Sequence, residues 1–339
     1  MAQAAVAKQS RAMAQNKALV LGASGFLGSH VVKALVAAGR PVRILTRPSS
    51  DTAMTDHLDL ERHQGNVFDR DTLRKAMQGC SSVFYCIVDT RSWLRDSIPL
   101  YQTNVQGSRV AMEIALEMDI QRFVFTSSVV AIGLNPSGIA SEADEFNWED
   151  QAPPYVMTRV EAERQLLELC RKGLPGIVCN VATTFGGHDH QPTPHGELLK
   201  LTVERRMPVY WNTKMSVVGI KDAADALLLA EQHGKVGERY IIADRMMDIG
   251  EATSKTAAFA GVKPPRREVP LWVVTAATWI AEKLMHALNR DTVLTMSSIA
   301  LSRIMGDYDN RKARTELGWR PRPMAKSLEE AAAWFKENA

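Results

Sequence analysis

Hydrophobic and polar positions along the chain follow two alternating patterns. Short runs of β-branched and other apolar residues, which favour strands, alternate with longer segments whose apolar residues recur every three or four positions, which favours helices. The strand-like runs are residues 17–22, 41–47, 61–67, 81–88, 121–128 and 175–181. The helix-like segments are residues 26–39, 71–79, 101–119 and 155–173. This order predicts an α/β fold, a Rossmann-type doubly wound parallel sheet with helices on both faces.

The pattern loosens after residue 185, which predicts a second, smaller domain. Residues 17–185 are expected to form the sheet domain, to which residues 215–245 return with one more α/β stretch. Residues 186–214 and 246–339 are expected to form a mainly helical substrate-binding domain. Residues 1–16 are rich in Ala and Gln and lack the continuous apolar stretch of a secretory signal, so a flexible tail is predicted.

Composition excludes several classes of function. The chain has 339 residues, of which 45% are hydrophobic and 23% charged, which is typical of a soluble globular protein with a well-buried core. Its net charge of +3 is small and dispersed, so no nucleic-acid partner is predicted. The four cysteines have no zinc-type spacing and lie in apolar contexts, which favours reduced thiols and a cytoplasmic location.

One apolar segment near the C-terminus, residues 269–288, approaches the length of a membrane span. Thr275, Thr278, Glu282 and Lys283 interrupt it and make it amphipathic. Because its polar face is not basic, the segment is predicted to be a helix that packs on its own protein rather than one that contacts a membrane. No membrane span is predicted.

A glycine-rich sequence, GASGFLG, lies between the first predicted strand and the first predicted helix. Its glycines are Gly22, Gly25 and Gly28. Glycine permits a tight turn and a close approach of the backbone to a pyrophosphate, and the N-terminus of the following helix attracts anions. The sheet domain is therefore predicted to bind a dinucleotide, with a purely structural glycine turn as the alternative.

This glycine spacing and the chain length resemble the extended branch of the short-chain dehydrogenase/reductase superfamily, which is the NAD-dependent epimerase/dehydratase superfamily. The sequences TRSWLRDSIPLYQTNVQGS, TTFGGHDHQPTPHG and YDNRKARTELGWRPRP are similar to those of its dihydroflavonol-reductase-like and hopanoid-associated epimerase-like group. The resemblance extends from Lys17 to Trp334. The cofactor-binding residues that it implies are Gly22, Ser24, Gly25, Phe26, Leu27, Gly28, Arg47, Asn66, Val67, Tyr155 and Arg159.

The end of the second predicted strand bears on the identity of the cofactor. Thr46 and Arg47 stand where an acidic residue would bind the ribose 2′-hydroxyl of NAD. An arginine can pair with a 2′-phosphate, which favours NADP(H) over NAD(H). Two alternatives stay open, since Asp51 could serve NAD and Arg47 could be a solvated surface residue. Asn66 and Val67 take the place of the Asp and apolar residue that border the adenine in the superfamily.

The resemblance also implies a catalytic set, and one of its members departs from the superfamily pattern. It places the catalytic Ser at Ser128 and the acid/base Tyr at Tyr155, with Arg159 where the superfamily has Lys. Tyr155 and Arg159 are four residues apart and project from one face of a helix. A tyrosine can exchange a proton with a carbinol oxygen if a nearby cation stabilises its phenolate, while Ser128 hydrogen-bonds the same oxygen.

Arg159 changes what this set is expected to do. It keeps the positive charge but cannot deprotonate, so it cannot relay a proton as Lys can. We expect a rate about tenfold to a thousandfold lower than with Lys. The alternative is that Arg159 is only a residue of the helix surface.

Three histidines and a tryptophan are candidate substrate-binding residues. His188, His190 and His195 crowd a loop that should border the substrate, and Trp93 is a candidate pocket wall. The HxH pair suggests a metal, but no nearby Cys or Glu completes a tetrahedral set, so no metal site is predicted. Solvent exposure of the histidines and core packing of Trp93 are the alternatives.

Together these residues predict an NADP(H)-dependent oxidoreductase that reduces a ketone or aldehyde, or oxidises a secondary alcohol, of a medium-sized and fairly apolar small molecule. One alternative is a nucleotide-sugar epimerase or dehydratase, although the sequence GGHDHQPTPHG offers no Arg or Lys to hold a diphosphate. The departures at Arg159 and at Val181, where this group usually has Pro, leave open a catalytically weak NADP(H)-binding sensor or scaffold. The resemblance further implies a homodimer.

Overall fold

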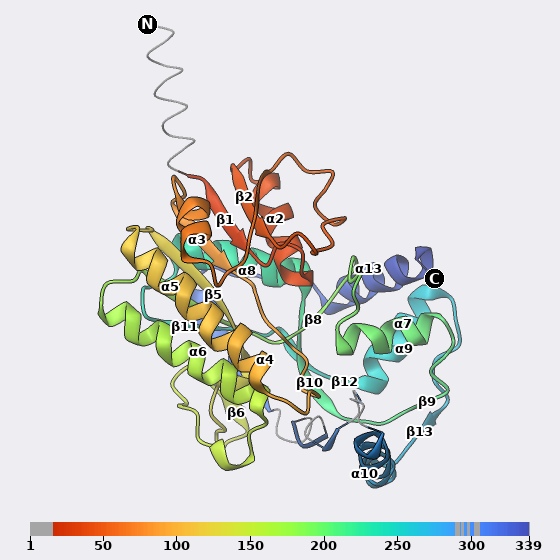
Figure 1. The fold of residues 1–339 in the computed structure, drawn as a ribbon. Helices are drawn as coiled ribbons and strands as arrows, with labels where there is room; N and C mark the ends of the chain where they lie inside the picture. The colour runs from red at the N-terminus through yellow and green to blue at the C-terminus, as the bar shows by residue number, and fades with distance from the viewer. Residues whose placement is uncertain (1–15, 289–291, 293–294, 297–298, 302–305, 339) are drawn as a thin grey trace, which may run out of the picture.

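A seven-stranded parallel sheet forms the centre of the molecule (Figure 1). The computed structural model describes residues 16–288, 292, 295–296, 299–301 and 306–338. The strand order is β11-β7-β5-β4-β1-β2-β3, which reverses direction between β1 and β4 and is that of the predicted doubly wound sheet. The strands are β1 (Ala18–Leu21), β2 (Val42–Thr46), β3 (Glu61–Gln64), β4 (Ser82–Tyr85), β5 (Arg122–Ser128), β7 (Gly176–Val181) and β11 (Arg239–Ile242).

Helices cover both faces of this sheet, and each face has its own apolar core. Successive side chains of a strand point to opposite faces, so Val20 lies in one core and Leu19 in the other. The helices are α2 (Phe26–Ala37) and α8 (Ile220–His233) on the first face, and α3 (Arg70–Met77), α5 (Ser108–Glu117) and α6 (Pro154–Arg171) on the second.

A smaller layer lies beyond the carboxyl ends of the central strands. It has a three-stranded sheet in the order β12-β10-β8 and a separate apolar core that includes Phe185, Met215 and Leu328. Its elements are β8 (Thr183–Phe185), β10 (Lys214–Gly219), β12 (Arg245–Asp248), α7 (Pro194–Val203), α9 (Ile249–Ala260) and α13 (Met324–Glu337).

The remaining elements are short, apart from α10. Strand β13 pairs with β9, and β14 pairs with β6. These elements are α4 (Ile98–Tyr101), β6 (Ile139–Ala140), β9 (Val209–Tyr210), β13 (Arg267–Glu268), α10 (Leu271–Ala287), β14 (Asp307–Tyr308), α12 (Arg311–Glu316) and the 3-10 turns η2 (Val129–Ala131) and η3 (Glu149–Gln151).

Two of the predicted segments can be placed directly. Strand β11 joins the central sheet beside β7, whereas β10 pairs with β8 and β12 in the smaller sheet. The predicted tail, residues 1–16, lies outside the described residues except for Asn16.

The single helix predicted over residues 101–119 is interrupted. A π-helical turn, η1 (Gln102–Gly107), separates α4 from α5. Its backbone hydrogen bonds span five residues instead of the four of an α-helix. Such turns are frequent at functional sites, and this one carries Asn104 toward α6, as described below.

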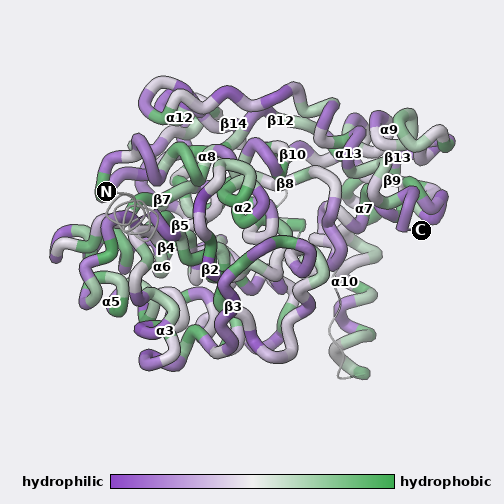
Figure 2. Tube along the Cα trace, turned by 90° about the horizontal axis from the view of Figure 1, so that it is seen from above, coloured by the Kyte–Doolittle hydropathy of each residue, from purple (hydrophilic) through white to green (hydrophobic). Residues whose placement is uncertain are grey.

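The segment at 269–288 forms helix α10, and the side that carries Thr278 is buried against the rest of the chain. Helix α10 leaves Trp272, Trp279 and Ile280 exposed. Figure 2 shows α10 extending away from the rest of the chain. Sequence amphipathicity told us that the helix has two faces, but not which of them contacts the protein. Among the described residues no helix has both the length and the apolar character needed to cross a membrane.

Candidate active site

The glycine-rich loop lies at the point where the strand order reverses. Gly22 follows β1 with a φ of 89°, and a Cβ there would come within 2.7 Å of the backbone of Cys86, which follows β4. A Cβ on Gly28 would come within 2.1 Å of the Gly22 carbonyl oxygen. Both positions therefore require glycine, and they bring the start of α2 close to the ends of β1 and β4. This is the crevice where open α/β sheets bind ligands.

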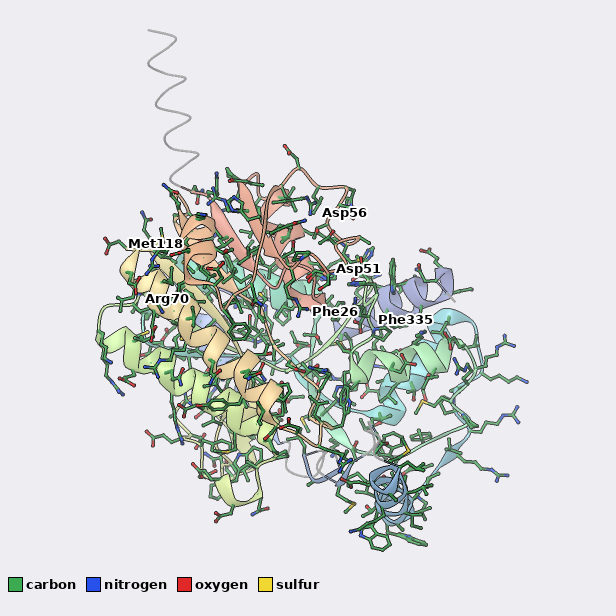
Figure 3. The ribbon with its side chains drawn as sticks, in the orientation of Figure 1. Phe26, Asp51, Asp56, Arg70, Met118 and Phe335 are labelled. Carbon is green, nitrogen blue, oxygen red and sulfur yellow. The ribbon has the colours of Figure 1, made fainter. Side chains whose placement is uncertain are left out.

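The first turn of α2 offers backbone donors to an anion. Gly25 is its N-cap and has no side chain to occupy the N–H groups of that turn. Ser24, Phe26 and Leu27 are partly exposed beside it. Figure 3 shows Phe26 on the side of the sheet that faces α13, the helix that carries Phe335. The loop thus leaves the backbone N–H groups at the start of α2 available to a phosphate group.

The residues after β2 and β3 border the same edge of the sheet. Arg47 is exposed, and its guanidinium has no ion-pair or hydrogen-bond partner in the described part of the chain. The Oδ2 of Asp51 lies 3.7 Å from the Nε2 of His190. Asn66 is exposed, and its Oδ1 accepts a hydrogen bond from the Phe68 N–H. Val67 is buried in the core.

Tyr155 and Ser128 meet at the carboxyl edge of the sheet. Ser128 is the last residue of β5, and Tyr155 lies in the first turn of α6, which begins at Pro154 as the two prolines predicted. Their side chains are close enough for Ser128 to affect the pKa of the phenol. Burial raises the pKa of Tyr155, and Arg159 and Ser128 partly oppose this. The phenol is therefore protonated at neutral pH and can donate a proton.

Arg159 lies one turn further along α6 and is buried, with 1% of its surface exposed. Its Nη2 donates to the main-chain oxygen of Thr126, and its guanidinium carbon lies 5.2 Å from the centre of the Phe125 ring. Its Nε and Nη1 have no hydrogen-bond partner among the described residues. Burial lowers the pKa of Arg159, but an arginine stays charged at neutral pH. Arg159 is thus a buried cation whose two remaining donors are enclosed by the protein.

A buried carboxylate continues the same face of α6 and was missed by sequence reasoning. Glu163 Oε2 accepts hydrogen bonds from Ser127 Oγ at 2.6 Å and from Asn180 Nδ2 at 2.7 Å, and Glu163 Oε1 lies 3.3 Å from Arg239 Nη1. Burial raises the pKa of Glu163, and these three donors oppose the rise. The spacing of four residues from Arg159 was the available signal.

Asn180 links this network to the end of β5, because its Nδ2 also donates to the main-chain oxygen of Ser128 at 3.2 Å. The network therefore fixes the end of β5 against α6 and β7.

Asn104 was also missed. It lies in the π-helical turn, accepts a hydrogen bond from the Asp89 N–H at 2.7 Å and donates to the Asp89 carbonyl oxygen at 3.0 Å. It also donates to Thr158 Oγ1 at 3.1 Å, and Thr158 Oγ1 donates to the Tyr155 carbonyl oxygen at 2.7 Å. These bonds link the loop after β4 to the turn of α6 that carries Tyr155. Its position in the predicted helix gave no sign of this role, because the turn is irregular.

The candidate substrate residues do not gather at one point. His188 has a φ of 67° and packs against Trp334 of α13 with tilted rings whose centres are 4.5 Å apart, while His190 faces Asp51. Burial lowers the pKa of His195 to about 4, so its imidazole is neutral. Trp93 is partly exposed in the loop after β4. Within the described residues no three His, Cys, Asp or Glu side chains are placed to hold a metal ion.

The arrangement matches a known family. The model of the NAD dependent epimerase/dehydratase family matches residues 18–243. The chain belongs to this family. It is accordingly an NAD(P)-dependent oxidoreductase in the broad sense of the family, as the sequence predicted.

Two relatives cover nearly the whole chain. A Synechocystis protein named for dihydroflavonol 4-reductase is 32% identical over 324 residues, which span 94% of each chain. Sterol demethylase protein B of Methylococcus capsulatus is 29% identical over 321 residues, which span 94% of this chain and 98% of that protein. Among solved structures, that of gox2253 has a TM-score of 0.84 and 33% identity, and covers 96% of this chain and 99% of its own. The family's fold thus extends over both layers of the molecule.

Proposed function

We propose that this protein is an NADP(H)-dependent reductase of a ketone or aldehyde, working in reverse as a dehydrogenase of a secondary alcohol. The observation that carries the proposal is the pairing of Tyr155 in the first turn of α6 with Ser128 at the end of β5, beside the buried Arg159. A phenol kept protonated by burial is suited to give a proton to a carbonyl oxygen as that oxygen gains negative charge. Ser128 would hold the same oxygen, so both groups would act on one atom.

The glycine loop and the positive charge of Arg159 support binding of a nicotinamide dinucleotide. Gly22, Gly25 and Gly28 leave the backbone at the start of α2 open to a pyrophosphate. The Nε and Nη1 of Arg159 are enclosed by the protein, so Arg159 would act on the site through its positive charge. When bound, the nicotinamide ring supplies or accepts the hydride. Arg159 would hold its positive charge beside Tyr155 throughout, and any proton relay would use hydroxyls and water rather than Arg159 itself.

The surroundings of Arg47 support NADP(H) over NAD(H). Arg47 is exposed and has no partner in the described part of the chain, so its guanidinium is available to a 2′-phosphate. Asp51, the residue that could have served NAD, faces His190 instead.

The histidine loop supports an apolar substrate rather than a nucleotide sugar. Burial lowers the pKa values of His188 and His195, and neutral imidazoles attract a diphosphate weakly. Relatives named for a flavonol reductase and for sterol demethylation suggest a medium-sized ring system. The substrate that we propose is therefore a fairly apolar ketone or its alcohol.

The test begins with binding of NADPH and NADH to the wild-type protein, followed by oxidation of the bound reduced cofactor against a panel of ketones and aldehydes that includes steroid and flavonoid ketones. We expect tighter binding of NADPH and ketone-dependent oxidation. Arg47→Gln should reduce the preference for NADPH by about tenfold or more, because it removes a bidentate phosphate contact, while the exposed control Arg171→Gln should not.

Tyr155→Phe decides the chemistry. It should lower kcat by about a hundredfold to ten-thousandfold and leave the dissociation constant of NADPH unchanged. Full turnover in Tyr155→Phe would refute the role of the phenol. Turnover of nucleotide sugars with an oxidised cofactor that does not exchange would favour the epimerase alternative. Cofactor binding without turnover on any substrate would favour a sensor or scaffold.

A further inference from the structure

Helix α10 turns its apolar side away from the protein. Trp272 is 72% exposed, Trp279 55%, Ile280 61% and Leu284 59%. At 100° per residue these four positions fall within one side of the helix, together with the exposed Lys283. Leu288, just beyond the helix end, extends the same surface with 57% exposure. Two tryptophans and three large aliphatic residues therefore form one continuous apolar face in solvent.

The opposite side of α10 is the more polar one, and it faces the chain. Thr278 is 1% exposed, and Thr275 and Glu282 are partly covered. Glu282 Oε2 accepts a hydrogen bond from the Met296 N–H at 3.0 Å. A surface helix of a globular protein has the reverse arrangement, with its apolar stripe inward. An apolar face of this kind marks an interaction site rather than ordinary surface.

A basic ribbon leads directly into this helix. Strand β13 pairs with β9, and α10 begins three residues after Glu268, the last residue of β13. Lys263, Arg266 and Arg267 precede the helix on one side of this pair, and Arg205 and Arg206 precede β9 on the other. All five are exposed.

The charge of this ribbon is largely uncompensated. Arg206 pairs with Glu204 at 2.9 Å, while the other four basic side chains have no ion-pair partner within the part of the chain that the structure describes. Glu268 is the acidic residue on the strand pair itself. The ribbon therefore presents a net positive surface next to the start of α10.

We propose that the apolar face of α10 and the basic ribbon dock this protein on the surface of a membrane that contains anionic lipids. Trp272 and Trp279 are suited to the boundary between headgroups and acyl chains, and Lys283 can extend its amine to the headgroups while its stem stays apolar. The helix lies along the surface and does not cross it. The inference goes beyond the proposed reaction and does not depend on it.

The charge of the ribbon favours a lipid surface over a second copy of the chain. A two-fold dimer through α10 would pair each patch with its own copy, and this net positive patch offers no complementary charge to the basic ribbon. Like charges brought together in an interface oppose association. Anionic headgroups instead supply the complementary charge along a surface that the helix can enter.

The experiment is flotation of the full chain with vesicles of phosphatidylcholine alone and of phosphatidylcholine with one third phosphatidylglycerol. We expect strong binding to the anionic vesicles that weakens with added salt. Trp272→Gln/Trp279→Gln should lower binding tenfold or more, by roughly the loss of two buried indole rings. The control Ile139→Gln/Val236→Gln removes apolar residues of similar exposure elsewhere, 52% and 46%, and should bind as wild type does.

The basic ribbon is tested separately. Arg266→Gln/Arg267→Gln should lower binding to the anionic vesicles by roughly tenfold or more, at about fivefold for each charge, and leave the weak binding to neutral vesicles unchanged. The control Arg171→Gln/Lys172→Gln removes two exposed charges from the end of α6. NADPH binding and thermal unfolding of every variant verify that the fold is kept.

Three results would overturn the proposal. Wild-type protein that floats with neither kind of vesicle would exclude membrane docking. Binding that Trp272→Gln/Trp279→Gln does not weaken would exclude α10 as the docking element. A dimer in analytical ultracentrifugation that the tryptophan variant dissociates, with no vesicle binding, would assign the face to a second copy instead.

Discussion

Helices α6 and α10 both break the usual division between a buried apolar side and an exposed polar side, but in opposite directions. α6 buries Arg159 and Glu163, whereas α10 exposes Trp272 and Trp279. In α6 the charges are held by partners within the protein, namely Thr126, Ser127, Asn180 and Arg239. In α10 the apolar face has no such partner within the described residues. The comparison shows that charged residues buried in a helix indicate a site of chemistry, whereas large apolar residues exposed on a helix indicate a surface for an external partner.

Loss of the buried carboxylate of α6 should have the largest effect. Glu163→Ala leaves Ser127, Asn180 and Arg239 without their shared acceptor, and removing one member of a buried ion pair is costly. We expect a loss of about 3 kcal/mol in the free energy of unfolding, measured with urea.

The matched control for Glu163→Ala is Glu168→Ala on the exposed side of the same helix. Glu168 pairs with Lys172 at 2.6 Å, and both side chains are 59% exposed. This substitution should leave the free energy of unfolding close to that of wild type, because solvent screens the exposed pair. Equal effects of the two substitutions would mean that the buried carboxylate of α6 stabilises the fold no more than an exposed one does.

The next effect concerns the buried cation. Arg159→Met keeps an unbranched apolar stem but removes the charge beside Tyr155, so kcat should fall by about a hundredfold. Arg159→Lys keeps the charge and adds a group that can relay a proton, so kcat should rise by about tenfold. Steady-state kinetics with NADPH and an active ketone would measure both. If Arg159→Met turned over as fast as wild type, Arg159 would be a structural residue only.

Much of the sheet and of the glycine loop could be predicted, because both depend on local rules. Alternation of strands and helices predicts the doubly wound order, and the would-be contacts of Gly22 and Gly28 show why glycine is needed there. Tyr155 and Ser128 came from the resemblance, and the structure brings their side chains together.

Other features depend on contacts that are distant in sequence. A spacing of four residues puts Arg159 on the face of Tyr155, but only the fold turns its guanidinium onto Phe125 and the Thr126 carbonyl. Asn104 meets Thr158 across 54 positions through an irregular turn. For α10, the hydrophobic pattern defines two faces and leaves open which one meets the protein. In each case the sequence indicates the local conformation but not which distant residue the side chain contacts.

A buried acid without a cation should behave differently from Glu163. Asp189 is 2% exposed, and its Oδ1 has no hydrogen-bond partner in the described chain. Burial raises its pKa to about 6. The folded state therefore holds this proton more tightly than the unfolded state, and stability falls as pH rises from about 4 to about 6.

Asp189→Asn tests this sign. The variant should lose this part of the pH dependence and gain about 2 kcal/mol over wild type at neutral pH, relative to pH 4, in urea unfolding at a series of pH values. The exposed control Asp150→Asn should keep the wild-type profile. A profile for Asp189→Asn that matched wild type would show that Asp189 is solvated or paired.

The smallest effect is expected on the outer face of α10. In the absence of membranes, Trp272→Gln/Trp279→Gln should change the free energy of unfolding by less than about 0.5 kcal/mol, because exposed side chains away from the core contribute little to folding. Thr278→Asp on the inner face should cost about 2 kcal/mol, since it buries a charge without a partner. If the tryptophan variant unfolded as readily as Thr278→Asp, the exposed face of α10 would contribute to the folded core. Both helices would then have their partners within the protein, and α10 would need no external one.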